Sequence, residues 1–210
     1  MNTLLTTKKQ KTLRVLFFFI GIIILSLGIS LTIVSNFGAG AWDTLNVTLS
    51  NTFGYSIGTW VIIVGIILLL VSSILERRSP RVTSLLTSFV IGICIDIWML
   101  PLDTFVPKSQ LSELIVYTAG ILVTTLGLSF IIFVKFPPGP IDYFALAIRS
   151  RFCLSIGQAK TIGEIIGLLL VILFKGPIGI GTLLTTVIIG PFIKLSNKLT
   201  HPMLSKIIRA

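Results

Sequence analysis

Two aspartates occupy equivalent places in a doubled sequence element. Asp43 stands in F-G-A-G-A-W-D-T-L (37–45), and Asp142 stands in F-P-P-G-P-I-D-Y-F (136–144). Asp43 follows glycines and Asp142 follows glycine and prolines, residues that break the preceding helix, and each aspartate precedes apolar residues at helical spacing. We therefore expect a short amphipathic helix of about a dozen residues at each aspartate, covering about 18 Å, or roughly half a bilayer. Its apolar positions are Trp42, Leu45, Leu49 and Phe53 in one copy, and Ile141, Phe144, Ile148 and Phe152 in the other.

The aspartates have two interpretations. In the first, each is an N-cap whose carboxylate accepts hydrogen bonds from the first free N–H groups of its helix. In the second, the short helices enter the membrane from opposite faces, and their N-termini line a substrate or ion pathway near the midplane. That pathway would include Gly40, Trp42, Asp43, Gly139 and Asp142. The two roles are compatible, and the sequence leaves open whether the helices are re-entrant or interfacial.

Two further acidic residues fall inside predicted membrane spans, where ionised groups are costly. Asp96 lies two residues before Trp98, and Glu164 lies one helical turn after Lys160. A pathway or coupling-ion role would explain both acids. The alternatives are a side chain that reaches the membrane interface, or a buried hydrogen bond.

Signatures of enzyme chemistry are absent from the sequence. It contains no Walker lysine loop, no G-x-S-x-G and no H-E-x-x-H, and His201 is the only histidine. Cys94 and Cys153 have no metal-binding spacing, and we expect no disulfide between them. The sequence therefore predicts a protein that is not an enzyme and that uses no cofactor and no metal ion.

Composition places most of the chain in lipid. Of the 210 residues, 54% are hydrophobic and 11% are charged, with a mean hydropathy of +1.04, whereas soluble domains carry about 25% charged residues. The net charge of +10 is explained by basic residues that flank membrane spans, so we expect no nucleic-acid partner. The length fits one membrane domain, residues 1–210, with short cytoplasmic tails at both ends.

Six apolar segments are long enough to cross a bilayer as helices. They lie near residues 15–35, 57–75, 83–101, 114–134, 158–174 and 178–196. The fifth is the weakest, because Lys160 and Glu164 fall in its first turns. The sequence thus predicts an all-α, multi-pass protein with six transmembrane helices.

The basic residues indicate the orientation. With a cytoplasmic N-terminus, only Lys108 and Lys175 of the 17 basic residues fall in loops on the outer side. Arg77, Arg78 and Arg81 all fall in one inner loop. The positive-inside rule therefore predicts cytoplasmic N- and C-termini in a bacterial cytoplasmic membrane.

The doubled element belongs to a longer internal repeat. When the sequence is aligned with itself at a shift of 99 residues, which is the separation of Asp43 and Asp142, serines and aspartates coincide as well as glycines and aliphatic residues. The matches include Gly21 with Gly120, Gly28 with Gly127, Ser30 with Ser129, Gly40 with Gly139, and Ser56-Ile57-Gly58 with Ser155-Ile156-Gly157. After a one-residue deletion, the stripe Ser84, Ser88 and Gly92 matches Thr182, Thr186 and Gly190.

The repeat predicts an inverted architecture. Repeat 1 covers about residues 15–101 and repeat 2 about residues 114–196, and each holds three spans. An odd number of spans turns the second copy upside down relative to the first, as in many secondary transporters. We expect the two small-residue stripes to pack spans three and six together at the pseudo-two-fold axis, and Ser56 and Ser155 to cap the helices that follow them.

The motifs G-A-G-A-W-D (38–43), S-I-G (56–58), G-P-I-D (139–142) and S-I-G-Q (155–158) resemble those of the YczE/YyaS/YitT family of bacterial integral membrane proteins, most closely the YczE branch. The resemblance covers about residues 12–200. It implies a multi-pass protein of the plasma membrane, and it implies no substrate and no active-site residues.

Three hypotheses for the function follow. The leading one is a small transporter or transporter-like permease for an unknown small solute or ion. The second is a membrane-embedded interaction or regulatory protein that assists another complex. The third is a substrate-binding subunit of a larger uptake system, and assembly as a homo- or hetero-oligomer stays open. A transporter requires Asp43, Asp96, Asp142 and Glu164 to converge on one wet cavity, whereas a scaffold does not.

Overall fold

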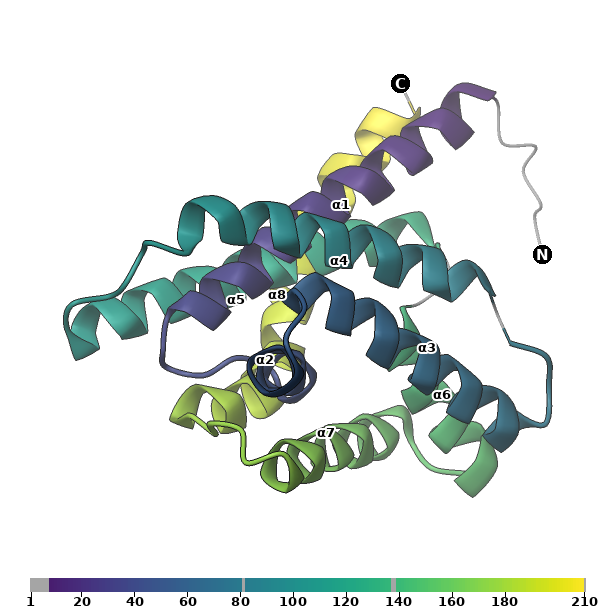
Figure 1. Ribbon diagram of the computed structural model, residues 1–210. Coiled ribbons are helices and arrows are strands. Elements are labelled where there is room, and N and C mark those ends of the chain that lie inside the picture. The colour runs from purple at the N-terminus through teal and green to yellow at the C-terminus, as the bar shows by residue number, and fades with distance from the viewer. Residues whose placement is uncertain (1–7, 81, 137–138, 210) are drawn as a thin grey trace.

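The structure, a computed structural model, describes residues 8–80, 82–136 and 139–209 (Figure 1). The regular elements in these residues are eight helices. Six are long: α1 (Lys8–Val34), α3 (Ile57–Glu76), α4 (Val82–Leu102), α5 (Gln110–Val134), α7 (Ile156–Leu173) and α8 (Ile180–Arg209). Two are short: α2 (Ala41–Phe53) and α6 (Pro140–Phe152). Arg81, Pro137 and Pro138, which entered the sequence predictions, lie outside the described residues.

The six long helices confirm the predicted spans. Each is long and apolar enough to cross a membrane, and only α8 continues well beyond its predicted end, to Arg209. Large apolar side chains stand outward along them, with Ile74 75% exposed, Leu100 77% and Val187 73%. A surface of this kind is stable in lipid and not in water.

Helices α1 and α5 cross at the centre of the bundle and share its largest interface (Figure 1). Glycines make the close approach possible, because a β-carbon at Gly28 would collide with Thr124 and one at Gly127 with Leu25. The prediction that spans three and six pack at the centre is therefore wrong. The centre is occupied instead by glycines of α1 and α5, the first spans of the two repeats. The internal repeat aligns these glycines, Gly28 with Gly127.

The small-residue stripe of α4 packs against α3. The Ser88 hydroxyl donates to the Val61 carbonyl at 2.9 Å, and Gly92 lies against Gly58 so closely that a β-carbon at Gly92 would stand 2.5 Å from the Gly58 carbonyl oxygen. Ser84 in the same stripe is fully buried. Small residues thus bring neighbouring helices of one repeat together, which is ordinary bundle packing.

The two short helices lie inside the bundle. Helix α2, seen nearly end-on in Figure 1, packs against α3 and α7, and α6 packs against the same two helices. Trp42 of α2 meets Phe144 of α6 edge to face, with ring centroids 6.1 Å apart. The predicted apolar positions Trp42, Leu45, Leu49, Phe144 and Ile148 are all buried in one core cluster. Three predicted positions, Phe53, Ile141 and Phe152, are exposed instead.

The helices that follow the short ones begin as predicted. The Ser56 hydroxyl accepts a hydrogen bond from the Thr59 backbone N–H at 3.1 Å, at the start of α3. The Ser155 hydroxyl accepts one from the Gln158 backbone N–H at 3.3 Å, at the start of α7. Both serines are therefore N-caps.

Candidate functional site

The doubled element places its aspartates in the first turn of each short helix. The N-caps of α2 and α6 are Gly40 and Gly139, and neither helix has a side-chain cap. Asp43 and Asp142 are the third residues of their helices, so the interpretation of the aspartates as N-caps is wrong, although their position at helix N-termini is confirmed. The helices begin earlier than expected because both glycines adopt extended backbone and Pro140 fits the first helical position.

Glu164 connects α7 to the N-terminus of α2. Its carboxylate accepts a hydrogen bond from the backbone N–H of Ala41, the first residue of α2, and it interacts electrostatically with Asp43. Helix α2 has no side-chain cap, so one of its free N–H groups is satisfied by a carboxylate from a neighbouring helix. The Asp43 side chain folds back over Gly40, the N-cap of its own helix. A β-carbon at Gly40 would stand 3.0 Å from the Asp43 Oδ2.

Lys160 connects α7 to the N-terminus of α6. Its ammonium lies 3.0 Å from the Asp142 carboxylate, and the two side chains are 54% and 44% exposed. Lys160 and Glu164 stand four residues apart on one face of α7, and Glu164 interacts electrostatically with both Lys160 and Asp142. One face of α7 therefore joins the N-termini of both short helices.

Asp43, Asp142, Glu164 and Lys160 together form what we name the acidic cluster. Within the described chain, no group of three His, Cys, Asp or Glu side chains has the arrangement of a metal site. Burial, and secondly the Glu164 carboxylate, raise the pKa of Asp43 from 3.8 to about 7. Asp43 lies on α2, outside the six long helices.

A buried amide lies one turn along α2 from Asp43. Asn46 is 2% exposed, and its side-chain oxygen has no hydrogen-bond partner among the described residues. Because residues three apart neighbour each other on a helix surface, Asn46 lies on the same side of α2 as Asp43. An unpaired buried amide oxygen costs free energy.

Trp42 forms an apolar wall beside the cluster. It is 4% exposed, and its ring lies against Gly167 of α7, where a β-carbon would stand 3.3 Å from it. Gly40, Gly139 and Trp42 thus occupy the places that the pathway interpretation requires of them, next to the carboxylates. Their roles in binding stay predictions.

Asp96 lies apart from the acidic cluster. It accepts hydrogen bonds from the Ser56 hydroxyl at 2.6 Å and the Gly58 backbone N–H at 2.8 Å. It thereby fastens α4 to the N-terminus of α3 through one exposed and one partly buried hydrogen bond, so the buried hydrogen bond among the expected alternatives is met only in part. Three of the four acids that a transporter would bring together are joined, and the fourth holds two helices to each other.

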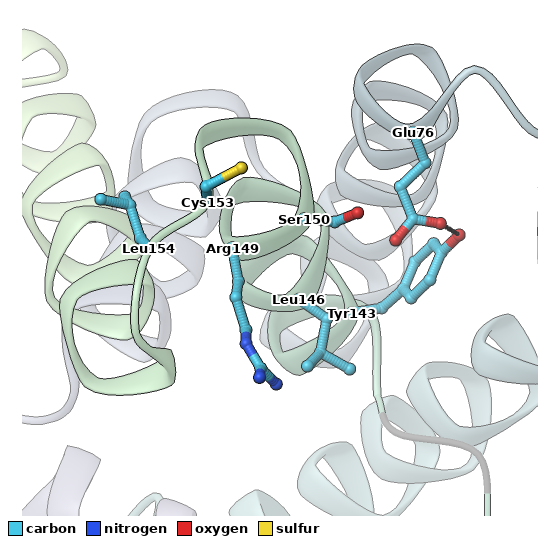
Figure 2. Close-up of a pocket in the computed structure, with 7 residues that line it drawn as sticks. All are labelled: Glu76, Tyr143, Leu146, Arg149, Ser150, Cys153 and Leu154. Carbon is cyan, nitrogen blue, oxygen red and sulfur yellow. Dashed lines mark hydrogen bonds between the residues drawn. The ribbon is translucent and has the colours of Figure 1, made fainter.

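A cavity of about 490 Å³ runs beside α6, from Tyr143 to the α6–α7 connection (Figure 2). The Tyr143 hydroxyl donates to the Glu76 carboxylate at the end of α3 at 2.8 Å. The other lining residues are Leu146, Arg149, Ser150, Cys153 and Leu154. Asp43, Asp96, Asp142 and Glu164 are not among the residues that line this cavity, so the expected convergence of the four acids is not met here.

Sequence reasoning missed three of these features. It considered Lys160 as a charge that weakens the fifth span, although its spacing of four from Glu164 could have indicated a shared site. It assigned no role to Asn46, whose polar side chain on the apolar face of α2 was the available signal. The contact between Tyr143 and Glu76 had no signal, because the two residues come from different repeats.

Comparison with known proteins supplies the family. A model described as a family of unknown function, DUF6198, matches residues 12–198. The chain is 41% identical to the uncharacterized protein YyaS of Bacillus subtilis over 179 residues, which cover 85% of the chain and 89% of the relative. It is 30% identical to the uncharacterized membrane protein YczE of the same organism, over 90% of the chain and 87% of the relative.

A more distant relative comes from Haemophilus influenzae, an uncharacterized protein that is 29% identical over 95% of the chain and 91% of its own length. No solved structure matches the chain. The higher identity to YyaS than to YczE reverses the order expected from the motifs, whereas the family itself is confirmed. With six apolar spans and matches that cover most of its length, the chain is an integral membrane protein that belongs to the DUF6198 family, together with YyaS and YczE.

Proposed function

We propose that this protein is a small permease that carries a cationic solute across the bacterial cytoplasmic membrane. The observation that supports this most strongly is the convergence of two half-length helices on one face of α7, with Asp43, Asp142 and Glu164 at their N-termini. Secondary transporters bind solutes where discontinuous helices meet inside the bundle. Ionisable side chains inside a membrane protein cost free energy, and a protein without a binding or transport site has no functional reason to keep them there.

The charge of the acidic cluster favours a cation. Three carboxylates face one ammonium, and the two helix N-termini add about half a positive charge each. The balance stays negative while Asp43 is ionised, and it approaches zero when Asp43 takes up a proton. Exchange of a proton for a cation at this site would couple transport to the pH gradient. The unpaired Asn46 oxygen is an additional acceptor for a solute N–H group.

Contacts at the centre of the bundle support inverted repeats. Gly28 meets Thr124 while Gly127 meets Leu25, and at a shift of 99 each contact is the counterpart of the other. The same reciprocity relates Gly21 with Ile131 to Gly120 with Thr32. A two-fold axis produces reciprocal contacts of this kind. The packing of α3 on α6 and of α7 on α2 follows the same rule.

The orientation follows from charge. Both termini are cytoplasmic in our proposal, because nearly all basic residues then lie on the inner side. The short helix α2 then enters from outside and α6 from inside. Arg149 and Arg151, at the end of α6, would lie in the cytoplasm, and the cavity beside α6 would open there.

The other functions make different demands. A regulatory membrane protein or a binding subunit of a larger uptake system would not move a solute alone, and neither requires the acidic cluster to be ionised. We also propose that the protein is not an enzyme, since none of the catalytic patterns sought in the sequence is present.

Uptake into proteoliposomes tests the proposal even though the solute is unidentified. Vesicles that contain the purified chain are incubated with a bacterial metabolite extract, and their contents are read by mass spectrometry. Wild-type vesicles should accumulate one or more cationic solutes above protein-free vesicles. Asp43→Asn/Glu164→Gln vesicles should not, whereas Asp103→Asn, a change at an exposed acid between α4 and α5, should retain uptake. Equal accumulation in the double variant would remove the cluster from the mechanism.

A further inference from the structure

Helices α3 and α4 are fastened together by a small set of residues that we name the first seam. It consists of the Gly58–Gly92 backbone contact, the Ser88 hydroxyl bond to the Val61 carbonyl, and Asp96 bound to Ser56 and Gly58. Figure 1 shows the two helices running side by side. The two helices can approach this closely because neither glycine carries a β-carbon.

The same residues recur in α7 and α8, where they are not packed. Gly157 and Gly190 are the counterparts of Gly58 and Gly92, and a β-carbon at either would meet no atom within 4 Å. In the part of the chain that the structure describes, α7 and α8 share no interface comparable to that of α3 and α4. Instead α8 runs away from α7 beyond their connection (Figure 1).

We propose that α7 and α8 close on each other through Gly157 and Gly190, in a second conformation of the protein, to form a second seam like the first. The segment 174–179 that joins them is suited to act as a hinge, since it contains Gly176, Pro177 and Gly179, and Lys175 has a φ of 57°. Closure would bury the side chains on the facing surfaces of α7 and α8, so that they no longer contact lipid.

One charge difference explains why the two seams differ in this structure. Asp96 of the first seam accepts hydrogen bonds from the N-terminus of α3, whereas its counterpart in repeat 2 is Lys194, which is exposed. An ammonium cannot accept from the N-terminus of α7, and the positive end of that helix repels it. The second seam lacks its carboxylate and is therefore the weaker of the two.

Closure would also cover the acidic cluster. In the first seam Ser88 lies against Gly65, with 3.1 Å from the Ser88 Cβ to a β-carbon at Gly65. The counterparts in repeat 2 are Thr186 and Glu164. Because Glu164 carries a side chain where Gly65 has none, the second seam would be wider than the first at this level, with Thr186 over the Glu164 side chain, and it would separate the cluster from one side of the membrane. This inference deepens the proposed function, on which its role in transport rests, because it names the gate.

Cysteine cross-linking tests the closure. In the first seam, the Ser56 hydroxyl lies 2.6 Å from the Asp96 Oδ2, so cysteines at the equivalent pair in repeat 2, Ser155 and Lys194, would come within disulfide range. Ser155→Cys/Lys194→Cys leaves both seam glycines in place and is made in a chain in which Ser replaces the free cysteines Cys94 and Cys153. The matched control is Ser155→Cys/Leu195→Cys, which moves one thiol to the next position of α8.

After mild oxidation in membranes, the first pair should form an intramolecular disulfide several-fold more than the control pair. Equal yields from the two pairs, or no disulfide in either, would overturn the inference. A disulfide between two copies of the chain would overturn it as well, since the open faces would then bind another protomer. Absence of the link with intact cation uptake would refute the seam and leave the permease standing. A link, combined with no cation uptake by the unaltered chain, would leave the seam standing and refute the permease.

A second variant addresses the charge. Lys194→Asp restores the acceptor of the first seam, so it should stabilise the closed conformation and slow maleimide labelling of Thr186→Cys, a position that closure would cover, several-fold. Lys194→Ala removes the ammonium without adding an acceptor and should slow labelling less. Identical labelling rates in wild type, Lys194→Asp and Lys194→Ala would contradict the explanation.

Discussion

The Lys160 ammonium lies 3.0 Å from the Asp142 carboxylate, and this ion pair joins the first turns of α7 to the N-terminus of α6. Both side chains are about half exposed, so the pair contributes only about 0–1 kcal/mol to stability. We expect Lys160→Met to lower the unfolding temperature in detergent only slightly, while cation uptake by proteoliposomes is lost. A large loss of stability together with unchanged uptake would show that the pair serves folding alone.

Alanine substitutions at the equivalent glycines Gly58 and Gly157 should change the stability of the protein in opposite directions. Gly58→Ala places a methyl group against the Gly92 carbonyl, and overpacking of this kind costs about 1–3 kcal/mol. Gly157→Ala adds the same methyl group in open space and should stabilise α7 by roughly 0.5–1 kcal/mol, because alanine favours helix over glycine. Thermal unfolding of both variants in detergent measures the difference, which would vanish if neither glycine had a packing role.

Asp96 should be far more important for stability than its counterpart. Asp96→Ala leaves the Gly58 N–H and the Ser56 hydroxyl without their acceptor, which costs about 1–3 kcal/mol. Lys194→Ala changes an exposed side chain, for which we expect about 0.5 kcal/mol or less. Comparable losses in chemical or thermal unfolding would contradict the assignment of Asp96 to the α3–α4 contact.

The proton on Asp43 predicts the dependence of stability on pH. Its pKa in the folded chain is about 7, above the ordinary 3.8, so between these values the folded state holds a proton that the unfolded state releases. This contribution to stability is complete below the lower pKa, falls as pH rises and is lost above the higher one. The unfolding temperature should therefore fall between about pH 5 and 7, and Asp43→Asn should flatten this slope. Asp103→Asn is the control and should leave the slope unchanged.

Much of the fold could be predicted because lipid simplifies the problem. Span lengths follow from bilayer thickness, and the glycines and prolines of the doubled element indicate a break before each short helix. The capping serines were readable for the same local reason. The start of α2 at Ala41, and not at Asp43, could not be predicted. The sequence did not show that the Glu164 carboxylate of a distant helix meets the first free N–H group.

The pairing of helices was less predictable. Small-residue stripes occur on α1, α4, α5 and α8, and all can support close contact, so composition alone did not indicate which pair lies at the centre. The candidate site was predicted in its members but not in its connections. Asp43, Asp142 and Glu164 converge, whereas Asp96 was separated from them by the hydrogen bonds of Ser56 and Gly58, which depend on the register between α3 and α4.

The most direct test of the central claim is the charge preference of thiol chemistry at the two short-helix N-termini. Gly40→Cys and Gly139→Cys place thiols beside the acidic cluster while they leave its carboxylates in place. A β-carbon at Gly139 would meet no atom closer than 4.0 Å, and one at Gly40 would meet only the end of the Asp43 side chain, at 3.0 Å. In a chain without Cys94 and Cys153, each thiol is treated with cationic aminoethyl or anionic sulfonatoethyl methanethiosulfonate. Rates are normalised to those of a free thiol in solution.

A wet, cation-selective site predicts that both thiols react and that the cationic reagent is faster at each by a factor of about 10, which corresponds to about 1.4 kcal/mol of electrostatic preference. The preference should disappear in the Asp43→Asn/Glu164→Gln background. Thiols that do not react, or that react equally with both reagents in the unaltered cluster, would contradict the claim that these helix ends form a pathway for cations.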